Sequence, residues 1–522
     1  MFSYKNSIPL VVTIIFLSIP LYLIQNDLWD GVIISYGSAK NDLSGIKFWF
    51  FQSGWHLQYF QIALFHALAK FLSIDYVDMN KLIICISFFF ILKEISFMLK
   101  KVFQIKKIWI FLVFLFFSAS PFMSVLSSSV MGFHLVSLLF CMMGVRLFRK
   151  NYYFLGALLM LLSFSYPATL GLAFGISYFL DSVQKNKKFL SRKLNIYFPS
   201  AHSIIVILLA STFYISHKIL FVPYGFWEEY YSIRNIFSLK GFFVFGFRTI
   251  EFISHFFPMI IIGTLICIIN KKFSFKKIFY CDEKIIGLIF LTFSSCITYI
   301  LVGKSAGIID IYDWSTRHVM PFYIPFAIIS ILFIKKFVSK NILKNLLIFF
   351  PFILNISFGI YSWNDKLQRD DFYKIFGGYL SSNIETFQNS RIDIIRDNKP
   401  AIRFYEYNYI YFLNTKKDNS FIAETPFKLE AALNKVLNAD FGLKNEDLVL
   451  LSKMDYIDKL RFLESSYPDL KKSLELYLVS DIDSISFAKS IDENVLKKDY
   501  GKELGIGYKR YLRSIADNLF DD

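Results

Sequence analysis

Two aspartates follow the first apolar run of the chain within six residues. In "LIQNDLWDGVIISYGS", Asp27 and Asp30 stand on either side of Trp29, directly after the apolar run Ile8–Ile24. Partial desolvation beside a bilayer raises the pKa of a carboxyl group, which suits it to act as a general base on a hydroxyl. Asp27 is nearer the apolar run, so we expect it to be the base. The plain alternatives are two solvated loop acids, or one acid that caps a helix.

A second set of residues has the chemistry to hold a phosphate. In "GKSAGIIDIYDWSTRHVMP", Lys304, Arg317 and His318 precede a late apolar run, and Arg248 begins an earlier one. A guanidinium group holds phosphate oxygens through two parallel hydrogen bonds, so Arg317 is suited to bind a phosphate leaving group. The alternatives are an interfacial anchor for Arg317 and His318, and a local ion pair with Glu251 for Arg248.

Three residues of the same predicted loops are candidates for binding a substrate: His56, Glu228 and Arg234. Histidines of this kind are more often packed or exposed on the surface, and loop acids are more often solvated. The chain has five cysteines, but they form no C-x-x-C pair. We therefore expect neither a zinc site nor a disulfide framework.

Repeated apolar runs must position these residues. The chain of 522 residues is 55% hydrophobic, with a mean hydropathy of +0.46, which is more apolar than a soluble protein of this length needs. We predict an all-α polytopic membrane domain at residues 1–361, with about 11 spans. The expected spans are near 7–24, 78–99, 108–120, 131–147, 152–166, 167–181, 196–217, 249–269, 285–303, 318–334 and 343–361.

Most of the excess positive charge lies in the part of the chain that contains the predicted spans. Residues 1–361 carry 33 Lys and Arg against 14 Asp and Glu, whereas residues 362–522 carry 24 against 27. Alternate loops hold most of the cations, and the positive-inside rule assigns those loops to the cytoplasm. The N-terminus is then cytoplasmic, and Asp27, Asp30 and the tail are extracytoplasmic. Because the positive charge accompanies the membrane segments, we expect no nucleic-acid partner.

Two segments remain. "WHLQYFQIALFHALAKFLSID" (55–75), in the large first outer loop (25–77), carries polar residues through an apolar pattern. It predicts one or two amphipathic helices along the membrane surface; a buried span is the alternative. Residues 362–522 have a soluble composition. There "IDIIRD" and "IRFYEYNYIYFLN" predict strands, and "FKLEAALNKVL" and "YIDKLRFLESS" predict helices, which together indicate an extracytoplasmic α/β domain.

This layout resembles the GT-C superfamily of membrane glycosyltransferases, which use polyprenyl-phosphate-linked sugars. Three segments show this resemblance: the acidic "NDLWDG" after the first predicted span, the predicted interfacial helix "WHLQYFQIALFHALAKF", and "STRHVMPFYIPFAI" at the start of a late span. The second departs from the family's histidine-proline-proline pattern, because His56 is followed by Leu and Gln. The resemblance covers about 360 residues. It implies that Asp27 or Asp30 is the base, and that Arg317 and His318 lie by the donor phosphate.

The resemblance also implies an activity and its partners. The chain would move a sugar from a polyprenyl-phosphate donor to a glycan, lipid or protein acceptor at the outer face of a bacterial inner membrane, in surface polysaccharide synthesis. Carboxylates such as Asp27 and Asp30 could hold a divalent cation, but a lipid-monophosphate donor requires none, so we expect no cofactor. The rival functions are a polymerase or ligase that uses lipid-pyrophosphate glycans, and a transporter of lipids or glycans.

Overall fold

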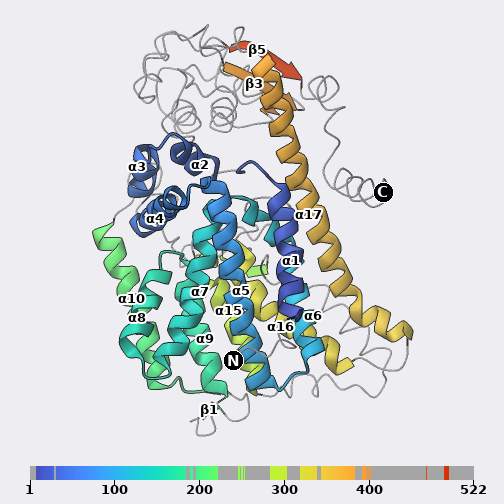
Figure 1. Cartoon of the computed structure of the whole chain (residues 1–522). Helices are drawn as coiled ribbons and strands as arrows, with labels where there is room; N and C mark the ends of the chain where they lie inside the picture. The colour runs from blue at the N-terminus through green and yellow to red at the C-terminus, as the bar shows by residue number, and fades with distance from the viewer. Residues whose placement is uncertain are drawn as a thin grey trace. The chain divides into compact units, whose positions relative to one another are not determined.

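The chain is mostly helical in the computed structural model shown in Figure 1. The structure describes residues 8–28, 31–53, 55–183, 189–191, 196–221, 245–246, 249–250, 252, 283–301, 318–337, 342–382, 391–396, 399–400, 466 and 487–492. The chain divides into two compact units. We name them the helical unit (Met1–Leu23 with Phe50–Asp365) and the tail unit (Ile24–Trp49 with Lys366–Asp522).

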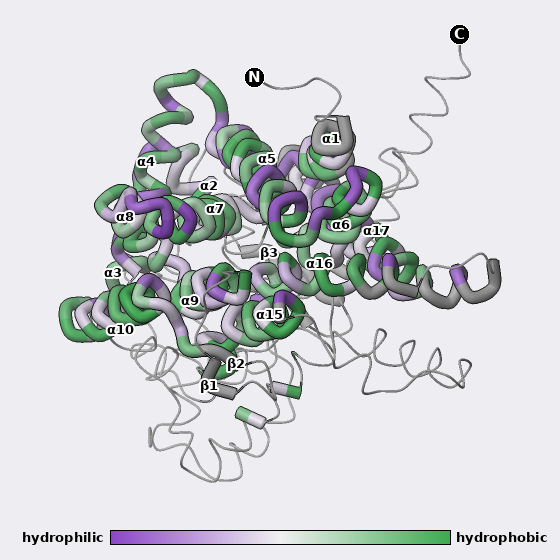
Figure 2. The backbone as a smooth tube through the Cα atoms, turned by 90° about the horizontal axis from the view of Figure 1, so that it is seen from below, coloured by the Kyte–Doolittle hydropathy of each residue, from purple (hydrophilic) through white to green (hydrophobic). Residues whose placement is uncertain are grey.

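The helical unit is a bundle of apolar helices. Seen from below, the axes of α5, α7, α9, α15 and α16 point toward the viewer as a group of mainly hydrophobic coils (Figure 2). Its described helices are α1 (Ile8–Leu23), α4 (His56–Leu72), α5 (Tyr76–Phe103), α6 (Lys107–Ser118), α7 (Val130–Phe148), α8 (Tyr153–Ser163), α9 (Ala168–Ser182), α10 (Ala201–Leu220), α15 (Glu283–Leu301), α16 (Met320–Phe337), and the greater part of α17 (Ile342–Ser382), with the short 3₁₀ helix η2 (Pro121–Ser127) and the antiparallel pair β1 (Phe189–Ser191) and β2 (Ile196–Tyr197).

Glycines let neighbouring helices of the bundle approach closely. Gly171 and Gly175 lie four residues apart in the "GLAFG" stretch of α9, and both face Ser294 of α15. A Cβ at Gly171 would overlap the backbone oxygen of Ser294, so only glycine fits there. Gly144 of α7 and Gly156 of α8 bring their helices together in the same way. Pairs of small residues four apart are typical of helices that pack within membranes.

One stripe of α17 packs against the end of α6 and the segment that follows it. Asn355 donates from Nδ2 to the backbone oxygen of Phe116 at 2.7 Å. One turn further on, Gly359 leaves room for the backbone oxygen of Ala119. The Ser362 hydroxyl then lies 2.5 Å from the hydroxyl of Ser124. Positions 355, 359 and 362 lie on one face of a helix, so this face is fixed by polar and small side chains.

Three of the described helices are long and apolar enough to cross a membrane: Tyr76–Phe103, Val130–Phe148 and Lys284–Leu301. Other apolar helices in the described residues are shorter: Thr13–Leu23, Lys107–Ser118, Tyr153–Ser163, Ala201–His217 and Met320–Leu332. The structure therefore supports the prediction of a mostly helical membrane protein, because it has apolar helices long enough to span a membrane.

Most of the described helices begin and end within a few residues of the predicted spans, but α17 continues well beyond the span expected at 343–361. The span expected at 108–120 is the helix α6, and the pair expected at 152–166 and 167–181 is α8 and α9. Most of the span expected at 249–269 lies outside the described residues. The segment 55–75 forms the single helix α4.

The tail unit combines helices with a small sheet. It contains α2 (Gly31–Ala39), most of α3 (Ser44–Gln52), the end of α17, β3 (Arg391–Arg396), β4 (Lys399–Pro400) and β5 (Phe487–Asp492). The strand order is β4-β3-β5, with β3 antiparallel to β4 and parallel to β5. The strand predicted at "IDIIRD" overlaps β3, whereas the strand and the two helices predicted further on lie outside the described residues, Ser466 excepted. The helix α17 continues without a break through residue 361, where we predicted the domain boundary.

Candidate active site

Asp27 belongs to the short segment Ile24–Leu28 that follows α1, which we name the acid loop. Its side chain is fully buried, at 0% exposure. The Ser35 hydroxyl of α2 donates to Asp27 Oδ2, and the Leu28 backbone N–H donates to Oδ1 at 2.9 Å. The carboxylate is therefore held in one orientation between the loop and α2.

The acid loop is also held by α17. The backbone N–H groups of Gln25 and Asn26 donate to Asp370 Oδ1 at 3.1 and 2.7 Å, and Asn26 Nδ2 donates to the same oxygen at 2.9 Å. Asp370 is 1% exposed, and its other oxygen pairs with Lys374 Nζ at 2.7 Å. Hydrogen bonds to a buried charge are among the stronger ones in proteins. The three hydrogen bonds from Gln25 and Asn26 to Asp370, which we name the clamp, therefore fix the two residues that precede Asp27.

Asp370 is not among the predicted site residues, although the sequence contains a weak signal for it. Asp370 and Asp371 precede Lys374 by four and three residues, a spacing that pairs opposite charges on one helix face. The structure has both pairs, with Lys374 at 2.7 Å from Asp370 and 4.0 Å from Asp371. The partners of Asp370 in the acid loop lie 344 and 345 residues away, and no local pattern predicts them.

His318, a predicted phosphate-binding residue, is buried in the helical unit two residues before α16 begins. Its ring lies 4.4 Å from the ring of Tyr299, which lies 6.1 Å from Tyr166; the Tyr166 ring is 4.2 Å from His134. All four side chains are buried. Their ring contacts connect the segment before α16 with α15, with the turn between α8 and α9, and with α7. His318 therefore has a fixed place in the bundle.

Polar contacts connect α4 to the same turn between α8 and α9. Gln58 Nε2 donates to the backbone oxygen of Ser165 at 2.6 Å, and Gln61 Nε2 donates to its hydroxyl at 3.3 Å. The Ser165 hydroxyl also lies 3.1 Å from that of Ser137 in α7. Gln58 and Gln61 therefore face the bundle and anchor α4 to it.

His56, a predicted substrate-binding residue, begins α4 and packs against aromatic rings. Its ring lies 4.0 Å from Phe51 and 4.3 Å from Phe221, measured between centroids. The neighbouring Trp55 lies 5.1 Å from the ring of His217 in α10. These ring contacts are those of a packed histidine, and a substrate-binding role for His56 stays a prediction.

The other predicted site residues lie outside the described residues: Asp30, Glu228, Arg234, Arg248, Lys304 and Arg317. Asp27 belongs to the tail unit, whereas His56 and His318 belong to the helical unit. Within the described ranges, no group of three or more His, Cys, Asp or Glu side chains could hold a metal ion.

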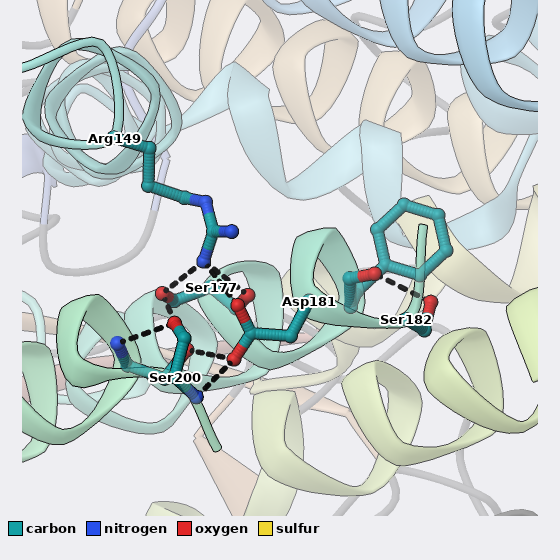
Figure 3. A network of polar contacts seen from close by, with 7 residues as sticks. Arg149, Ser177, Asp181, Ser182 and Ser200 are labelled. Carbon is teal, nitrogen blue, oxygen red and sulfur yellow. Dashed lines mark hydrogen bonds and ion pairs between the residues drawn. The ribbon is translucent and has the colours of Figure 1, made fainter. Parts of the chain in front are cut away.

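The best-defined polar network of the described chain joins α7, α9 and α10 (Figure 3). Arg149 Nη1 donates to Asp181 Oδ1 at 2.6 Å and to the backbone oxygen of Ser177 at 3.0 Å. Asp181 Oδ2 accepts from the Ser200 N–H at 2.8 Å and from the Ser203 hydroxyl at 2.7 Å. Ser200 also caps α10. Both oxygens of the Asp181 carboxylate accept hydrogen bonds from the chain itself. The network therefore has a structural role and holds the helices together.

Among the described residues outside the predicted spans, His66 and Asp42 have shifted pKa values. Burial lowers the pKa of His66 in α4, and the nearby charge of Lys70 lowers it further. The pKa of Asp42 is lowered chiefly by its hydrogen bond from the backbone N–H of Ser44, at 2.9 Å, where α3 begins. His66 is therefore neutral at pH 7, and Asp42 is ionised.

The chain matches no protein-family model, no curated protein and no solved structure in the corresponding comparisons.

Proposed function

We propose that the chain is a multi-pass membrane glycosyltransferase with the GT-C layout. It transfers a sugar from a polyprenyl-phosphate donor to a glycan, lipid or protein acceptor. The observation that carries the proposal is Asp27: a fully buried carboxylate, fixed by Ser35, in the loop that directly follows the first apolar helix. A loop acid that served only solubility would be exposed to water, whereas Asp27 is buried and hydrogen-bonded to Ser35 and Leu28.

The proposed topology has eleven spans, a cytoplasmic N-terminus and an extracytoplasmic tail in a bacterial inner membrane. The unequal distribution of Lys and Arg among the loops supports it. The apolar helices of spanning length support a membrane location. In this topology the acid loop lies at the outer face, where a lipid-linked donor presents its sugar phosphate.

The proposed reaction is a single displacement with inversion. The Asp27 carboxylate takes the proton of the acceptor hydroxyl as that oxygen attacks C1 of the sugar. The bond between C1 and the phosphate oxygen breaks, and its electron pair leaves with the polyprenyl phosphate. In the proposal Arg317 and His318, with Lys304 and Arg248, bind this phosphate and balance its charge. His56, Glu228 and Arg234 are proposed to bind the substrates.

A transfer assay with two kinds of donor tests this proposal. Membranes that contain the chain receive radiolabelled sugars linked to polyprenyl monophosphate or to polyprenyl pyrophosphate, with and without EDTA. We expect label to pass to the acceptor fraction from a monophosphate donor, and EDTA to leave the rate unchanged. Transfer from pyrophosphate donors alone would indicate the polymerase or ligase class, and would contradict the proposal.

Substitution of a phosphate-binding residue sharpens the same assay. Arg317→Ala is expected to lower the rate on the order of 100-fold, because the leaving group loses its bidentate partner. Lys47→Ala is the matched control, since Lys47 is an exposed cation of the tail unit. Equal rates for the two variants would remove Arg317 from the proposed mechanism.

A further inference from the structure

The hydrogen bonds from Gln25 and Asn26 to Asp370 have no role in the proposed reaction. Asp370 lies in α17, far along the sequence from Asp27, and accepts three hydrogen bonds on one oxygen from Gln25 and Asn26. All these residues belong to the tail unit. Asp370 therefore holds the two residues directly before Asp27, whereas the Asp27 carboxylate accepts hydrogen bonds from Ser35 and Leu28.

We propose that Asp370 is a positioning residue that holds the acid loop, and with it the Asp27 carboxylate, in the orientation needed for proton transfer. Backbone donors define the path of the loop, because two consecutive N–H groups aimed at one oxygen fix the peptide planes between them. Lys374 keeps the other carboxylate oxygen of Asp370 in place at 2.7 Å. The role assigned to Asp370 rests on the proposed function of Asp27.

The strength of the clamp comes from its charge. An ionised acceptor forms hydrogen bonds about twice as strong as a neutral one. Asp370→Asn keeps an acceptor oxygen for Gln25 and Asn26 but loses the charge, whereas Asp370→Ala removes the acceptor. The variants should therefore form a graded series, with Asp370→Asn between the wild type and Asp370→Ala.

A thiol-accessibility experiment tests the clamp without any assay of transfer. Asp27→Cys is introduced into a chain in which Cys85, Cys267 and Cys281 are changed to Ser. The buried thiols Cys141 and Cys296 stay as internal references for folding. A membrane-impermeant maleimide should label Asp27→Cys about tenfold faster when Asp370→Ala is added, and about threefold faster with Asp370→Asn, while the references stay unlabelled.

The matched control is Gln368→Ala, which changes an exposed residue of the same helix. It should leave the labelling rate unchanged. Equal labelling of Asp27→Cys with and without Asp370→Ala would overturn the clamp. The Asp370→Asn variant keeps the test decisive if Asp370→Ala fails to fold.

The transfer assay then separates positioning from simple support of the fold. Asp370→Ala, with Asp27 intact, should lower kcat on the order of 100-fold and leave KM for the donor unchanged, because Asp370 has no contact with substrate in this mechanism. Faster labelling with unchanged kcat would overturn the positioning role and leave Asp27 as the base. If the wild type transfers no sugar, the proposed function and the positioning role both fail, while labelling still reports whether Asp370 holds the loop.

Discussion

Arg149 and Asp181 form a buried ion pair that joins α7 to α9. Arg149 Nη1 lies 2.6 Å from Asp181 Oδ1, and the two side chains are 9% and 3% exposed. Charges buried to this extent are stable only as a pair, because a single buried charge loses its hydration without compensation. The pair therefore fixes the relative position of two central helices of the bundle.

Removal of one partner should destabilise the bundle strongly. We expect Arg149→Met to lower the free energy of unfolding by about 3–5 kcal/mol, since Asp181 is left as an unpaired buried charge. Thermal unfolding in detergent micelles measures the change. Lys81→Met is the control, because Lys81 pairs with Asp78, whose side chain is 62% exposed, and should cost about 1 kcal/mol or less. Similar losses for both variants would contradict the structural role of Arg149.

A single methyl group should disturb the contact between α9 and α15. In Gly171→Ala the new Cβ would overlap the backbone oxygen of Ser294, which cannot rotate away as a side chain can. We expect a loss of about 1–3 kcal/mol in stability. Gly246→Ala is the matched control, because no atom lies within 4 Å of a Cβ placed there. Thermal unfolding should occur at a lower temperature for Gly171→Ala than for Gly246→Ala. An unchanged stability of Gly171→Ala would show that α9 and α15 pack less closely than the structure indicates.

His66 should make the stability of the chain depend on pH. Its pKa in the folded chain lies below the ordinary value of 6.5, so the unfolded chain binds the proton more readily. The stability from neutral His66 is complete above about pH 6.5 and decreases as the pH falls below it. We expect His66→Gln to flatten the stability curve between pH 7 and pH 5. A slope equal to that of the wild type would assign the pH dependence to other groups.

The positions of the helices could be predicted because the apolar runs are long and Lys and Arg interrupt them. The prediction of 108–120 against the observed Lys107–Ser118 is typical. The continuation of α17 could not be predicted in this way, since residues 362–382 are polar enough to resemble a soluble domain. Their apolar members Trp363, Leu367 and Tyr373 are nevertheless buried, so packing extends the helix beyond its apolar part.

The candidate site was predicted only in part. Asp27 was chosen as a candidate base from its residue type and its place after the first apolar run, and this role stays a prediction. Its partners could not be predicted, since Ser35 is a common residue and the contact of Asn26 with Asp370 spans 344 residues. Likewise "GLAFG" indicates a packing face, but nothing in it specifies Ser294 as the neighbour. Contacts between distant segments follow from the fold as a whole.

The central claim is that Asp27 is the base of a sugar transfer, and the transfer rate of Asp27→Asn tests it most directly. Wild type, Asp27→Asn and Asp42→Asn are compared in proteoliposomes with the radiolabelled polyprenyl-monophosphate donor that the wild type uses. Asp42 is an exposed acid of the same unit, so Asp42→Asn should keep the wild-type rate. We predict that Asp27→Asn lowers the rate on the order of 100-fold or more, because a general base is lost. A wild-type rate for Asp27→Asn, or no transfer by the wild type from any such donor, would contradict the claim.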